Sequence, residues 1–90
     1  MNMKEKLEKV INKVIPSAYP FIKKINIRIH MIQEDDGNFS EVLVVNYIVR
    51  RSANSGDISD LVTETESLFN MLNPAPNQKV DVVVTQSKKK

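Results

Sequence analysis

The sequence predicts one small α+β domain in the order helix, strand, strand, helix, strand. Apolar residues recur every three or four positions in some segments, the period of an amphipathic helix, and alternate with polar residues in others, the period of a half-buried strand. A chain of 90 residues, 41% hydrophobic and 27% charged, supplies one hydrophobic core and no second domain. We expect residues 1–87 to form this domain and residues 88–90 to be a basic tail.

A first amphipathic helix is predicted near the N-terminus. Its apolar residues share one face: Leu7, Val10, Ile11, Val14 and Ile15. Glu5 precedes Lys9 by four residues, the favourable order for a helical ion pair. Because a proline disfavours the α conformation of the residue before it, Pro16 is expected to end the helix and to open a short connection, residues 16–20.

A β-hairpin is predicted next. The first strand alternates apolar residues, Ile25, Ile27, Ile29 and Met31, with polar ones, Lys24, Asn26, Arg28 and His30. The polar stretch 33–38 contains Asp36 and Gly37, a pair suited to the positive backbone angles of a hairpin turn. The second strand, residues 41–50, is rich in β-branched residues and apolar at almost every position, so both of its faces need cover.

A second helix and a last strand complete the predicted order. Asp57 is expected to be the N-cap of the helix, which ends before Pro74. Apolar residues and one threonine recur at helical spacing in this helix: Ile58, Leu61, Val62, Thr65, Leu68, Phe69 and Leu72. In the last strand, Val80, Val82 and Val84 alternate with polar residues.

A hairpin followed by a helical return should place the last strand parallel to the second. If the last strand lies beside the first one, the strand order is 2-1-3 and both helices cover one face, the split βαβ arrangement. The second strand is then an edge strand with an uncovered apolar face, which we interpret as a partner surface. That surface comprises Val42, Val44, Asn46, Ile48 and Arg50. A different register, or the chain's own tail lying over the strand, is the alternative.

The residues that usually carry catalysis are sparse. The chain has no cysteine, which excludes disulfides and thiolate metal sites. His30 is the single histidine, and Glu34, Asp35 and Asp36 lack the ligand spacing of a calcium loop. We therefore expect no enzyme, no cofactor, no metal and no small-molecule substrate.

The basic residues define a second hypothesis, a nucleic-acid-binding module. The net charge is only +2, and the tail contributes three of the positive charges, so a strong phosphate-binding surface is not expected. Under this hypothesis the contacts come from strand residues and the tail: Arg28, Arg50, Arg51, Lys88, Lys89 and Lys90.

The order of elements resembles four known modules along the whole chain. These are the type II K-homology RNA-binding domain, the cytoplasmic domain of cation diffusion transporters, ring-building motifs of secretion systems, and small phage tail subunits. The split βαβ order itself is a ferredoxin-like topology. The K-homology Gly-x-x-Gly loop is absent, since the glycines are Gly37 and Gly56, and a metal-binding transporter domain would bring more histidines than His30. The ring and tail modules imply self-assembly through sheet edges.

The predicted function is therefore a non-catalytic structural or interaction subunit of ring or phage and virion type, a homo-oligomer or a part of a larger assembly. RNA binding is the alternative. Because no signal peptide or membrane span is recognisable, we expect synthesis in the cytoplasm.

Overall fold

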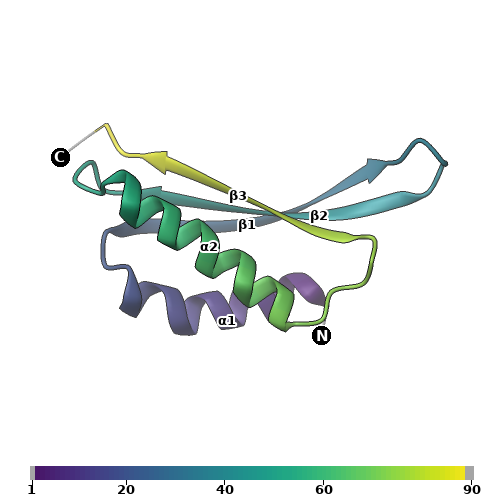
Figure 1. The fold of residues 1–90 in the computed structure, drawn as a ribbon, viewed down its shortest axis with the longest axis horizontal. Helices are drawn as coiled ribbons and strands as arrows, with labels where there is room; N and C mark the ends of the chain where they lie inside the picture. The colour runs from purple at the N-terminus through teal and green to yellow at the C-terminus, as the bar shows by residue number, and fades with distance from the viewer. Residues whose placement is uncertain (1, 89–90) are drawn as a thin grey trace.

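The structure, a computed structural model, describes residues 2–88 and has the predicted order of elements. These are α1 (Met3–Ala18), β1 (Ile22–Gln33), β2 (Phe39–Val49), α2 (Ser55–Met71) and β3 (Gln78–Gln86). Both helices lie on the same side of one twisted three-stranded sheet (Figure 1). The molecule is elongated, 45 × 24 × 19 Å, because the hairpin of β1 and β2 extends beyond the helices.

The strand order is β1-β2-β3, so the predicted order 2-1-3 is wrong. β2 pairs antiparallel with β1 and parallel with β3, and this parallel pairing was predicted correctly. The central position suits β2 because its side chains are apolar on both faces. Leu43 and Val45 have no exposed surface on the helix side, and Val44 on the opposite side is only 9% exposed.

The core lies between the helices and the helix-facing side of β2. Its buried members include Leu7, Ile11 and Ile15 of α1, and half-buried valines of β3 pack against them: Val80, Val82 and Val84. Two predicted core residues are exposed instead. Ile29 is 40% exposed because exposure on this side of β1 rises toward the hairpin end, from 8% at Ile27 to 60% at Met31. Val14 is 36% exposed because it lies about 100° around α1 from Ile15.

α1 does not end at Pro16 but continues to Ala18. A proline this close to the end of a helix removes one backbone hydrogen bond, and the fully buried Ile15 holds the preceding turn in place. The Tyr19 amide then donates to the Ile15 carbonyl oxygen at 2.9 Å and closes the last turn.

The N-cap of α2 is Asn54 rather than Asp57. The backbone N–H of Asp57 donates to Asn54 Oδ1 at 2.8 Å, and the backbone N–H of Asn54 donates to Asp57 Oδ2 at 3.3 Å. Asp57 therefore occupies the third position of the helix in a capping box, where its carboxylate also faces the positive end of the helix dipole.

A buried hydrogen-bond chain links α2 to the central strand. The Thr65 hydroxyl donates its one proton to the Leu61 carbonyl oxygen at 2.8 Å, so the Tyr47 hydroxyl must donate to Thr65 Oγ1, 2.7 Å away. Burial raises the pKa of Tyr47 to about 12, although the bond to Thr65 acts in the opposite direction.

Candidate functional site

The open face of the sheet consists of cross-strand rows that the pairing register defines. One row is Arg28, Val44 and Asp81, and the next is His30, Val42 and Lys79. The apolar stripe of β2 is therefore flanked by longer polar side chains on both neighbouring strands, which cover part of it. The wide bare apolar face expected for an edge strand is absent from this sheet.

The residues predicted as a partner surface lie together, with one exception. Val42, Val44, Asn46 and Ile48 follow one another along the open face of β2, whereas Arg50 lies beyond the end of that strand. Among the described residues, Asn46 Oδ1 is the buried side-chain oxygen that lacks a hydrogen-bond partner. The four residues form a narrow, half-buried stripe.

The predicted nucleic-acid contacts do not converge on one surface of the described chain. Arg28 lies on β1 in the same row as the acidic Asp81 of β3, and Arg50 and Arg51 lie in the connection to α2. Lys88 follows β3, and Lys89 and Lys90 lie outside the described residues. Within residues 2–88, no three His, Asp or Glu side chains lie close enough together to hold a metal ion.

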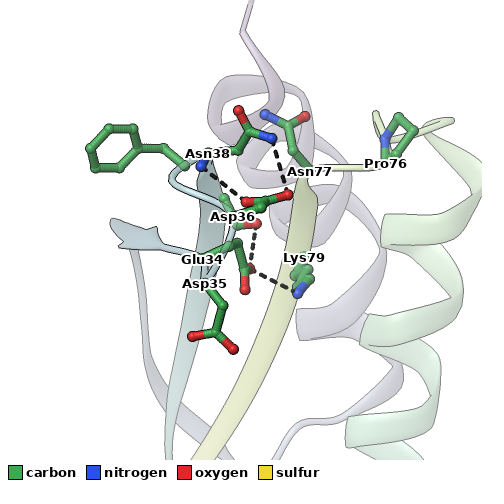
Figure 2. Close-up of a pocket in the computed structure, with 9 residues that line it drawn as sticks. Glu34, Asp35, Asp36, Asn38, Pro76, Asn77 and Lys79 are labelled. Carbon is green, nitrogen blue, oxygen red and sulfur yellow. Dashed lines mark hydrogen bonds and ion pairs between the residues drawn. The ribbon is translucent and has the colours of Figure 1, made fainter.

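A shallow pocket of about 480 Å³ lies between the hairpin turn and the connection from α2 to β3, and most of the residues that line it are polar (Figure 2). Glu34 Oε1 accepts hydrogen bonds from Ser40 Oγ at 2.6 Å and from Lys79 Nζ at 3.3 Å. These two bonds lower the pKa of the Glu34 carboxyl group. The nearness of Lys79 to Glu34 depends on the pairing of β3 with β2, so no sequence pattern signals it.

The acidic residues of this turn serve the turn itself. Asp36 accepts from the backbone amide of Asn38 at 3.0 Å and from its side-chain amide at 3.1 Å, and Gly37 has the positive φ of 85° that the turn requires. Since Glu34 and Asp36 already accept hydrogen bonds from their neighbours, the pocket offers no free carboxylate pair for acid–base catalysis.

The methionine thioethers are the most reducing side chains of the chain, and of the three methionines within residues 2–88 two are at the surface. Met71, at the end of α2, is 75% exposed and Met31, on β1, is 60% exposed, whereas Met3 is 7% exposed. Met31 lies on the helix-facing side of the hairpin, beyond the helices. Ile29 and Phe39 share that side by strand alternation and are exposed as well.

Several solved structures share this fold. An OsmC-like protein from Mycoplasma pneumoniae has a TM-score of 0.57 at 15% identity, over 93% of this chain and 64% of its own. An organic hydroperoxide resistance protein from Elizabethkingia anophelis has a TM-score of 0.57 at 16% identity, over 94% of this chain and 62% of its own. This chain therefore spans less than two thirds of both proteins.

The cytosolic domain of a cation diffusion facilitator family protein has a TM-score of 0.52 at 12% identity and covers 100% of both chains. The resemblance to cation diffusion transporters is thus confirmed at the level of the fold. No protein-family model and no curated sequence matches the chain. Within residues 2–88, neither helix is long and apolar enough to cross a bilayer.

These comparisons correct the function predicted from the sequence. Ring-building, phage-tail and nucleic-acid-binding modules were expected, whereas the fold is that of OsmC-like and organic hydroperoxide resistance proteins. The predictions of a structural or phage protein, of RNA binding and of a chain that is not an enzyme are therefore wrong. The prediction of a structural subunit depended on an uncovered edge strand, and β2 is the central strand. The RNA-binding prediction depended on the basic residues, and the prediction of no enzyme depended on the absence of cysteine and the single histidine.

Proposed function

We propose that this chain acts against organic hydroperoxides and that its exposed methionines react with them. The observation that carries the proposal is the fold shared with the organic hydroperoxide resistance protein over 94% of this chain. At 16% identity that likeness supports a class of function, and the reacting groups have to come from this chain's own residues.

The chemistry requires a two-electron reductant. A thiol is ruled out because the sequence has no cysteine, which leaves the thioether of methionine. In the reaction the O–O bond breaks, one oxygen atom is transferred to sulfur, and the remaining fragment leaves as the alcohol. Sulfur is oxidised to the sulfoxide and the hydroperoxide is reduced, so no further reactant is needed. A methionine sulfoxide reductase would restore the thioether.

The surroundings of Met31 suit an organic hydroperoxide better than hydrogen peroxide. Its neighbours on the same side of the hairpin, Ile29 and Phe39, expose apolar surface that an alkyl or aryl group can contact. Met71 lies at the end of α2 and is even more exposed, so it should react with less preference for the organic group.

The proposal predicts a fixed order of oxidation. On incubation with cumene hydroperoxide, peptide mapping by mass spectrometry should find one added oxygen atom at Met31 and Met71 well before Met3, the buried internal control. Substitution of both exposed residues by leucine should slow the protein's consumption of the hydroperoxide with little change in stability.

Reaction of Met31 no faster than free N-acetylmethionine amide would overturn the proposal, because the site would then add nothing to the thioether. Equal rates with cumene hydroperoxide and hydrogen peroxide, relative to that reference, would show that the apolar neighbours of Met31 have no role. Self-association as a homo-oligomer, of unspecified copy number, and a cytoplasmic location stay predictions from the sequence.

A further inference from the structure

A pocket of about 350 Å³ lies between the outer side of α1 and the end of α2. It is lined by three lysines and two apolar residues, Lys6, Lys9, Val10, Lys13 and Leu72. The lysines are three and four positions apart, so they follow one face of α1. Val10 and Leu72 are half-buried and pack against the core, which fixes the apolar floor of the pocket.

None of the three lysines of this pocket forms an ion pair within residues 2–88. The ion pairs of that part of the chain join Lys4 to Glu8 at 3.9 Å and Lys79 to Glu34 at 3.3 Å. The pair of Glu5 with Lys9 that the spacing predicts is not formed. The last turn of α2 carries no basic residue that could interact with the negative end of the helix dipole. Because Leu72 at that end lines the pocket, the dipole offsets part of the charge of these lysines.

The combination of floor and rim defines the ligand class. A small inorganic anion would find charge but would leave the apolar floor in contact with water, and a neutral alkyl compound would leave the ammonium groups without a partner. A lysine side chain has an apolar stem and a charged head, so three of them around Val10 and Leu72 form apolar walls with a cationic rim. A molecule with one alkyl chain and one anionic head matches both parts.

We propose that this pocket binds a single-chain amphiphilic anion of the fatty-acid type. The alkyl chain lies on Val10 and Leu72 between the lysine stems, and the carboxylate contacts the ammonium groups of Lys6, Lys9 and Lys13. The site is separate from Met31 on the hairpin and does not depend on methionine oxidation, so it goes beyond the function proposed above.

The test is titration of the protein with laurate below its micelle-forming concentration, followed by calorimetry and by NMR shifts of α1. We expect saturable binding that weakens as salt is added. Dodecyl alcohol and dodecyltrimethylammonium should bind at least roughly tenfold more weakly. The triple variant Lys6→Gln, Lys9→Gln, Lys13→Gln should lose laurate binding by a similar factor.

The matched control is Lys23→Gln with Lys24→Gln. Those lysines line a different pocket, beside Ile22 and Ile25, and their removal lowers the net charge without touching the site. Equal laurate affinity in the triple variant, or equal binding of laurate and dodecyltrimethylammonium, would overturn the proposal. So would binding to phosphatidylglycerol vesicles without binding of monomeric laurate, because the ligand would then be a bilayer surface.

Discussion

At the scale of single residues, the Tyr47 hydroxyl is a polar group that lies in the core. Tyr47 has no exposed surface, and its hydrogen bond to Thr65 is the side-chain bond that joins β2 to α2. The inward position of Tyr47 was predictable, because residues two positions apart share one side of a strand and Leu43 and Val45 face inward as well. Its partner was not, because Thr65 is an ordinary helix-face residue until the helix is placed over the strand.

Substitution of Tyr47 by phenylalanine should cost about 1 kcal/mol of folding free energy at neutral pH. The loss is limited because Thr65 keeps its bond to the Leu61 carbonyl oxygen. The variant should also remove part of the pH dependence. The folded protein keeps the hydroxyl protonated, with a pKa of about 12 against an ordinary value of 10.0, so its stabilisation is complete below pH 10 and is lost as the pH rises toward 12.

Urea unfolding from neutral to strongly alkaline pH measures this effect. Wild-type stability should fall more steeply above pH 10.0 than that of Tyr47→Phe. Tyr19, whose pKa is also raised by burial and by Glu64 and Asp60, is present in both and cancels in the comparison. Parallel curves would show that Tyr47 is not the titrating group.

At the scale of elements, sequence patterns located every helix and strand but misplaced some of their ends. The ends depend on which of several adjacent residues supplies a hydrogen bond. Asn54 and Asp57 are both good cap residues, and they are three positions apart, so either reading satisfies the pattern. The backbone conformation determines which of the two is the N-cap. It is Asn54, and Asp57 lies inside the first turn of α2.

Substitution of Asn54 by alanine should therefore destabilise the protein by about 1 kcal/mol, since the Asp57 amide loses its acceptor. Asp57→Ala should cost less, because the bond that it removes is longer, 3.3 Å against 2.8 Å. Ser55→Ala is the control within the same turn. Thermal unfolding of the three variants ranks them, and a larger loss for Asp57 than for Asn54 would restore Asp57 as the cap.

At the scale of the whole molecule, the strand order is what the sequence fails to predict. Because β2 is apolar on both faces, the sequence predicts an edge strand that binds a partner, whereas β2 is the central strand. Periodicity reports that both faces of a strand are covered, and it does not report which strand lies beside it. The pocket on α1 could not be predicted for the same reason, since it depends on which elements lie side by side. From the sequence alone, we would expect a solvent-exposed helix face at Lys6, Lys9 and Lys13. The fold places Leu72, far along the chain, next to them.

The strand order makes a prediction for hydrogen exchange in the native protein. With order β1-β2-β3, amides of β2 have hydrogen-bonding neighbours on both sides, so successive amides along Leu43 to Val49 should all exchange slowly. β1 is an edge strand, and amides along it should alternate between slow exchange, where they point toward β2, and fast exchange, where they point to solvent. NMR detection after transfer to deuterated buffer resolves the two patterns. Under the order 2-1-3 the two patterns would be exchanged, with uniformly slow exchange in β1 and alternating exchange in β2. That result would make β2 an edge strand, as the sequence predicts, and would contradict the order β1-β2-β3.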